Sequence, residues 1–336
     1  MASLNVLAQP VRRVSLAIRF LARCAAVTSA LAWAGTAQAA WPERPVTLVV
    51  PFTAGGITDV LARATAERLQ TALKAPFIVE NLPGGAGVLA ADHVLRAKPD
   101  GYTLLFTPVF QITMAPFTHR VNFDPVRDFK PVAAVAASPF VIAVGANVPA
   151  SNLAEFIAYV KARPGTIPFG SAGPGSMTHV SSAIFLKSAG LDMIHVPYKG
   201  VGQAFTDLLG GQIMMLSASP VEVKPYLNSG KMKPLAVTGT TRSKQLPGVP
   251  TILETLKSPP VITINGLVAP AKVPQEVIDA LSGVIMAAEK NPDFIERIDR
   301  LGAEPIVSTP AQFAKIIADD TALWRDTVRN LGLKPE

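Results

Sequence analysis

The stretch Pro51-Phe52-Thr53-Ala54-Gly55-Gly56-Ile57-Thr58-Asp59 joins a strand pattern to a helical pattern. The apolar residues 46–50 before it predict a buried strand. After it, apolar residues recur at spacings of four, three and four, which is typical of one helix face (Ala62, Ala66, Leu69 and Leu73). A strand, a glycine turn and a helix together aim free backbone N–H groups at an anion. An ordinary strand-to-helix turn has the same pattern, so both interpretations of this loop stay open.

The residues of this loop suit either interpretation. Gly55 and Gly56 have no Cβ, so a ligand could lie against the backbone. Thr58 or Asp59 is expected to cap the helix by accepting a hydrogen bond from its first N–H groups. Asp59 could instead bind the amino group of an amino-acid ligand, but a capping role is favoured.

Composition indicates a packed globular protein. The 336 residues are enough for two domains or one large one, and 49% are hydrophobic against 16% charged. No apolar run after residue 39 approaches the roughly 20 residues that a membrane-spanning helix needs.

Residues 1–39 have the order of a secretory signal. They carry four arginines and no acid, then a short apolar run, and end on Ala37-Gln38-Ala39. We expect cleavage after Ala39 and a periplasmic location. Arg12-Arg13 suggests twin-arginine export only weakly, and a retained membrane anchor is the alternative. The only cysteine, Cys24, lies in this segment, so no disulfide is expected after cleavage.

Charge argues against nucleic acid as a partner. The whole chain has a formal net charge of +7. Without the four signal-sequence arginines, 27 basic residues remain against 24 acidic residues, which leaves about +3. The basic residues are also scattered.

Further strand, loop and helix units follow the first. Residues 77–80 and 104–106 predict strands, and with the first strand they argue for a mainly parallel α/β sheet. Residues 85–90 match a dinucleotide-binding pattern, but no acid follows at the end of the next strand, so that function is disfavoured.

The middle of the chain predicts a second sheet. Residues 131–144 are almost uncharged and could be a strand pair that leaves the first sheet, followed by a helix that Ser151 caps. Residues 167–179 form another strand, glycine loop and helix start, now with three hydroxyl groups. Residues 262–269 could cross back, and helices at 275–289 and 310–330 close the chain.

At this point the chain resembles a known family, the Bug-family periplasmic substrate-binding receptors of tripartite tricarboxylate transporters. The resemblance covers essentially all of residues 41–336. It is carried by Trp41 to Pro45, Pro51 to Asp59, Val79-Glu80-Asn81, Pro83 to Gly87, Lys98 to Thr103, Phe123-Asp124-Pro125, Asp128-Phe129, Pro131-Val132, Gly173, Gly175-Ser176, His179, Val196 to Gly200, Asp207 to Gln212, Leu235 to Thr238, Leu246-Pro247, Val249 to Thr251, Gly266, Ala269-Pro270 and Trp324.

The resemblance implies an α/β, two-lobed type II periplasmic-binding-protein fold, or Venus flytrap, after the signal peptide. Residues 41–138 plus 268–336 would form lobe 1, and residues 139–267 lobe 2. It implies a receptor that binds a small carboxylate, hands it to membrane permease subunits, is a monomer and needs no cofactor. It also permits a signalling role with a sensor kinase as partner.

The resemblance also implies which residues hold the ligand. In lobe 1 they are Thr53, Ala54, Gly55, Gly56 and Asp59, with Thr107 and Pro108 as further contacts. In lobe 2 they are Ser171, Ala172, Gly173, Ser176, Tyr198 and Lys199. Two helix N-termini would then offer two positive poles, which a dicarboxylate could satisfy together. Leu82, Thr53, residues 180–183 and residues 213–222 depart from the family pattern, which puts the identity of the ligand in doubt.

Two other functions are disfavoured. His93, His119, His179 and His195 do not have metal-ligand spacing, and no cysteine supports them, so no metal is expected. Ser171 and Ser176 lie near His179, but the Gly-x-Ser-x-Gly pattern of a serine hydrolase is absent, and no base with an orienting acid follows from spacing.

Overall fold

The glycine loop at residues 51–56 follows the first strand of a six-stranded sheet in the computed structural model, which describes residues 41–227, 229–288 and 290–331. The signal-sequence prediction falls on residues outside this range. The chain divides into two units, Met1–Glu43 and Arg44–Glu336, and every element below belongs to the second.

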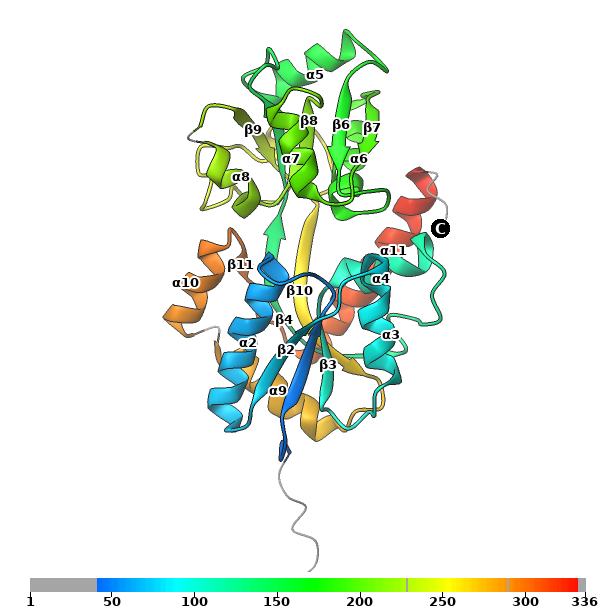
Figure 1. The fold of residues 1–336 in the computed structure, drawn as a ribbon, viewed down its shortest axis with the longest axis vertical. Coiled ribbons are helices and arrows are strands. Elements are labelled where there is room, and N and C mark those ends of the chain that lie inside the picture. Colours follow the sequence, from blue (N-terminus) through cyan, green and yellow to red (C-terminus); the bar gives the residue numbers. More distant parts are fainter. Residues whose placement is uncertain (1–40, 228, 289, 332–336) are drawn as a thin grey trace, which may run out of the picture. The chain divides into compact units, whose positions relative to one another are not determined.

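The first sheet has the order β11-β4-β10-β3-β1-β2. Its strands are β1 (Val46–Val50), β2 (Phe77–Asn81), β3 (Thr103–Pro108), β4 (Phe129–Pro139), β10 (Ile262–Pro270) and β11 (Glu304–Pro305). The helices in the same part of the chain are α2 (Ile57–Leu73), the short 3₁₀ helix η1 (Gly85–Gly87), α3 (Val88–Arg96), α4 (Val109–Thr118), α9 (Gln275–Ala288), α10 (Pro292–Arg300) and α11 (Pro310–Leu331). Figure 1 shows α2 and α3 on either side of this sheet.

The second sheet has the order β7-β6-β8-β5-β9. Its strands are β5 (Val141–Gly145), β6 (Pro168–Ser171), β7 (Ile194–Pro197), β8 (Met215–Ala218) and β9 (Met232–Val237). The helices around it are α5 (Leu153–Lys161), α6 (Met177–Ala189), α7 (Val201–Leu209), α8 (Pro220–Leu227) and the short η2 (Ile252–Glu254).

The prediction of a mainly parallel sheet is wrong, because both sheets are mixed. In the first sheet β1 pairs in parallel with β2 and β3, but β10 runs antiparallel to both β3 and β4. In the second sheet β5 runs antiparallel to β8 and β9. The chain leaves the first sheet along β4 and returns along β10, so these two strands must point in opposite directions.

The crossings between the sheets lie where the uncharged segments predicted them. β4 ends at Pro139 and β5 begins at Val141, and β10 pairs with β4 from Ile262 onward (Figure 1). The first sheet therefore includes residues 262–267, which the predicted lobe boundary assigned to lobe 2.

Apolar clusters fill the space between sheets and helices. The first sheet has a core that includes Val49, Leu105 and Phe313, and the second sheet has one that includes Phe156 and Phe185. A further cluster joins elements of both halves: Met177 and Val180 of α6 lie with Met114 of α4 and with Trp324 and Val328 of α11.

Two local details differ from the sequence predictions. Asn152, not Ser151, caps α5, because its side chain accepts the hydrogen bond from Glu155 N. Helices α4, α8 and α10 were not predicted. Prolines inside α4 and α8 hide their periodicity, since Pro116 and Pro225 ordinarily signal a helix end.

Candidate functional site

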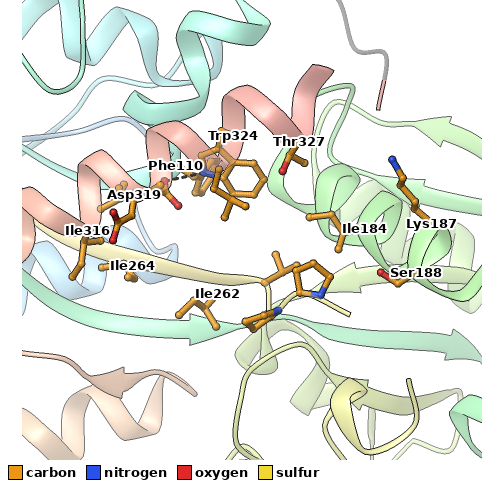
Figure 2. Close-up of a pocket in the computed structure, with 16 residues that line it drawn as sticks. Phe110, Ile184, Lys187, Ser188, Ile262, Ile264, Ile316, Asp319, Trp324 and Thr327 are labelled. Atoms are coloured by element: carbon orange, nitrogen blue, oxygen red, sulfur yellow. Dashed lines mark hydrogen bonds between the residues drawn. The ribbon is translucent and has the colours of Figure 1, made fainter. Parts of the chain in front are cut away.

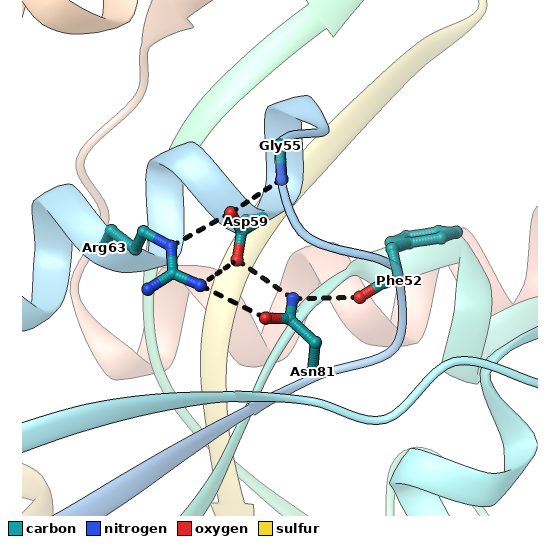
Figure 3. A network of polar contacts seen from close by, with 5 residues as sticks. All are labelled: Phe52, Gly55, Asp59, Arg63 and Asn81. Atoms are coloured by element: carbon teal, nitrogen blue, oxygen red, sulfur yellow. Dashed lines mark hydrogen bonds and ion pairs between the residues drawn. The ribbon is translucent and has the colours of Figure 1, made fainter.

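Asp59 organises the first glycine loop. Its Oδ2 accepts hydrogen bonds from Gly55 N at 2.9 Å and from Arg63 Nε at 3.0 Å, and its Oδ1 accepts from Asn81 Nδ2 at 2.9 Å (Figure 3). Asn81 Nδ2 also donates to Phe52 O at 2.9 Å. Burial raises the pKa of Asp59, but the hydrogen bonds from Arg63, Gly55 and Asn81 outweigh it and hold that pKa below its ordinary value. Asp59 is therefore an anion that fixes the loop.

The start of α2 has no side-chain cap, which corrects the expectation for Thr58 and Asp59. The N-cap residue is Gly56, which has no side chain that could accept a hydrogen bond from the first turn. Thr58 Oγ1 instead donates to Asn265 Oδ1 of β10 at 2.9 Å. Without a cap, the first-turn N–H groups of this 17-residue helix remain available to an anion.

The predicted first-loop residues Thr53, Ala54, Gly55 and Gly56 are exposed and contiguous. Gly55 has φ +91°, a conformation that favours glycine. The structure thus brings these four residues together at the uncapped helix start, above the buried Asp59.

The second glycine loop is held by its own hydroxyl groups. Ser176 caps α6 by accepting from His179 N at 3.3 Å, and Thr178 Oγ1 accepts from Ala172 N at 2.8 Å. Gly173 N donates to Ser171 Oγ at 3.1 Å. The two helix starts are therefore unequal: the protein satisfies part of the N-terminus of α6 itself, whereas that of α2 is open.

Two histidines stack beneath the second loop, and spacing in the sequence did not reveal them. The rings of His179 and His195 lie 4.0 Å apart at an interplanar angle of 11°, and Phe169 stacks on His195 at 5.0 Å. Gly175 N donates to His179 Nδ1 at 3.1 Å. Burial lowers the pKa of His179 to about 4, with a further contribution from His195, and burial also lowers the pKa of His195. Both rings are therefore neutral at pH 7.

Ser171 and His195 form a pair that resembles a nucleophile and its base. Ser171 Oγ lies 2.7 Å from His195 Nε2. However, Ser171 is only 1% exposed, and no carboxylate in the described part of the chain bonds to His195. The pair lacks both the access and the orienting acid of a serine hydrolase.

The remaining predicted residues lie around these loops. Tyr198 N donates to Ser171 O at 3.0 Å, and the Tyr198 hydroxyl donates to Asp207 Oδ2 at 2.7 Å. Burial, together with Asp207, raises the pKa of Tyr198 to about 12. Lys199 is exposed and next to the start of α7.

Thr107 and Pro108 are buried, at the end of β3 beside β10. Pro108 is in register with Asn265, whose Oδ1 holds Thr58 of α2. Asn265 is fully buried and its Nδ2 has no hydrogen-bond partner among the described residues. The sequence did not point to Asn265, because its only signal there is a polar side chain within the apolar run 262–269.

Among residues 41–227, 229–288 and 290–331, no group of three or more histidine, cysteine, aspartate or glutamate side chains could hold a metal ion. No helix in the same ranges is both long and apolar enough to cross a membrane.

A family model and a known relative both match most of this chain. Residues 61–333 match the family model described as the tripartite tricarboxylate transporter family receptor. A relative from Cupriavidus necator, the UPF0065 protein in the gbd 5′ region, is 36% identical over 94% of this chain and 97% of its own length.

Two solved structures share the fold. R. palustris Rpa4515, solved with adipate, has a TM-score of 0.80 and 31% identity over 88% of this chain and 100% of its own. The periplasmic binding protein BugD has a TM-score of 0.77 and 32% identity over the same shares. These relatives confirm the two-lobed periplasmic-binding-protein fold that the resemblance implied. The chain therefore belongs to the tripartite tricarboxylate transporter receptor family.

Proposed function

We propose that this protein is an extracytoplasmic receptor that binds a small organic carboxylate at its two glycine loops and delivers it to a tripartite tricarboxylate-type permease. The observation that carries the proposal is the uncapped start of α2, where exposed Gly56 and the first turn of the helix leave backbone N–H groups open to an anion. Adipate in the related Rpa4515 supports a dicarboxylate as the ligand class. The ligand-binding residues are those predicted above, with Asp59 holding the first loop.

The inequality of the two loops refines this proposal. The open start of α2 would take the first carboxylate through backbone N–H groups. The second loop already uses Ser171, Ser176 and Thr178 for its own hydrogen bonds, so it would meet the distal end of the ligand.

Ligand class is tested by thermal unfolding of the purified protein with dicarboxylates, tricarboxylates, amino acids, aromatic acids and neutral sugars. A ligand at about 100 times its Kd adds roughly 2.7 kcal/mol, which raises Tm by a few degrees. A rise with one carboxylate class and none with sugars supports the proposal. If no anion shifts Tm, before or after unfolding and refolding to remove a copurified ligand, the proposal fails.

The first loop is tested by Gly56→Leu. Gly56 has φ −75° and its Cβ position is clear except for Thr53 O at 3.9 Å, so leucine fits without backbone strain. Its side chain would obstruct the helix start and weaken carboxylate binding about tenfold or more. Gly248→Leu is the matched control, because a Cβ there meets nothing within 4 Å. Equal affinity in both variants would exclude the first loop as the site.

Location and role need separate tests. The protein isolated from the periplasm should begin near Ala40 or Trp41 by mass analysis, and a retained 1–39 segment would contradict cleavage. Deletion of the gene, with and without an intact permease, separates transport from sensing. Loss of uptake supports the delivery role, whereas loss of induction with uptake intact favours signalling to a membrane sensor.

A further inference from the structure

A pocket lies beside β10 and the helices α4, α6 and α11 (Figure 2). Ile262 and Ile264 line it, whereas Thr263 and Asn265 alternate to the opposite face of the strand, where Asn265 holds Thr58 of α2. The pocket is therefore separate from the proposed carboxylate site.

The pocket has the size and lining of a small-molecule site. Its volume is about 580 Å³, within the range of roughly 300–1,000 Å³ that is typical of ligand pockets. Most of the wall is apolar, with Phe110 from α4, Ile184 from α6, Ile264 from β10 and Trp324 from α11 (Figure 2).

One wall of this apolar pocket carries a carboxylate without a cation. Asp320 Oδ2 accepts from Thr113 Oγ1 at 2.5 Å and from Trp324 Nε1 at 2.8 Å, and both donors are neutral. Within the described ranges, no hydrogen bond reaches Asp320 Oδ1 and no salt bridge reaches either oxygen. Burial raises the pKa of Asp320 to about 6, so the group is mostly anionic at pH 7.5 and lacks a counterion.

The charged side chains that line the pocket with Asp320 do not serve as its counterion. Asp319 also lines the pocket, but it is exposed and pairs with Lys315 at 2.6 Å. Lys187 of α6 lies at the other end of the pocket, beyond Ile184 in Figure 2. A ligand that brings its own positive charge to Asp320 would supply the missing counterion, and its apolar body would cover the apolar wall.

We propose that this pocket binds a small apolar primary amine, whose ammonium group pairs with Asp320 while an aryl or short alkyl body lies against Phe110, Ile184 and Ile264. The site takes a cation, so its ligand class is the opposite of the anion proposed for the glycine loops. The proposal stands or falls independently of carboxylate binding.

The test uses 2-phenylethylamine and its neutral analogue 2-phenylethanol on the purified protein at pH 7.5. Binding is followed by calorimetry and by the indole N–H signal of Trp324, whose Nε1 touches Asp320. The amine should bind with a Kd on the order of 1 mM and shift that signal, and the alcohol should bind at least about tenfold more weakly. No binding of the amine at about ten times that concentration, or equal binding of both probes, would overturn the proposal.

Two variants locate the binding. Asp320→Asn keeps the shape of the side chain and removes its charge, so amine affinity should fall about tenfold. Asp326→Asn is the matched control, because Asp326 lies on the same helix but is exposed and does not line the pocket, and it should leave amine affinity unchanged. Equal effects of the two substitutions would overturn the proposal. If Asp320→Asn does not fold, Ile184→Trp replaces it: abolished amine binding supports the site, and retained binding overturns it.

Discussion

The carboxylate of Asp59 accepts a hydrogen bond from the backbone N–H of Gly55, four residues earlier, with 2.9 Å between Oδ2 and N. This contact folds the first glycine loop back onto the first turn of α2. The acid side chain thereby occupies one backbone donor and fixes the direction of the others. Asp59 is 2% exposed, so its role in the structure is to position the loop.

The first prediction follows from this contact. Asp59→Ala removes the shared acceptor of Gly55, Arg63 and Asn81, so the free energy of unfolding should fall by about 2–3 kcal/mol. Carboxylate affinity should fall as well, because the loop loses its fixed geometry. Urea denaturation and calorimetry measure the two effects.

The matched control for Asp59→Ala is Asp92→Ala. Asp92 also pairs with an arginine four residues later, Arg96, but that pair is on the surface. It should cost no more than about 0.5 kcal/mol. Similar losses in the two variants would show that Asp59 does not organise the loop.

The second prediction concerns pH and the stacked histidines. The folded-state pKa of His179, about 4, is below its ordinary value of 6.5, so the unfolded state binds more protons between these values. Stability is therefore present above pH 6.5 and is lost as the pH falls toward 4, by about 3 kcal/mol in total. Protonation of Nδ1 would also break its hydrogen bond from Gly175 N and release the second loop.

His179→Asn isolates this effect. Asparagine offers an acceptor to Gly175 N but does not titrate. The slope of unfolding free energy against pH between 4 and 6.5 should therefore be shallower in the variant than in the wild type, whatever its absolute stability. Asp320, whose raised pKa stabilises the fold at the acid end, is present in both proteins and cancels in the difference. Identical slopes in the two proteins would show that His179 does not cause this pH dependence.

The sequence predicted the parts of the site that depend on local patterns. The strand at Val46–Val50, the glycine loop and α2 lie together in the chain, and the apolar run of the strand and the 3.6-residue period of the helix are visible without tertiary structure. The second loop and α6 were found for the same reason. The direction of β10 was not, because antiparallel pairing with β4 depends on contacts between residues far apart in sequence.

Features formed by distant residues were missed. His179 and His195 lie on α6 and β7, and their stacking leaves no spacing signal. Asp320 occupies one polar position in the long amphipathic helix α11, and only the fold places it beside Thr113 of α4. The cap of α2 failed as a prediction because the helix begins at Ile57, so Thr58 and Asp59 lie inside its first turn, and Thr58 Oγ1 donates to Asn265 of β10 instead.

The last prediction compares two glycines that lack a positive φ. Gly266 lies in β10, where a Cβ would come within 2.4 Å of Phe313 Cζ and 2.8 Å of Ala133 O. Because the second contact is backbone of the paired strand β4, Gly266→Ala should destabilise the protein by about 1–3 kcal/mol. Gly283 lies on the exposed side of α9 with nothing within 4 Å of its Cβ position. Gly283→Ala should therefore stabilise the protein by about 0.5–1 kcal/mol through helix propensity. Urea denaturation of both variants measures the sign of each change in the free energy of unfolding. If Gly266→Ala leaves that free energy unchanged, β10 does not pack against Phe313 as closely as found.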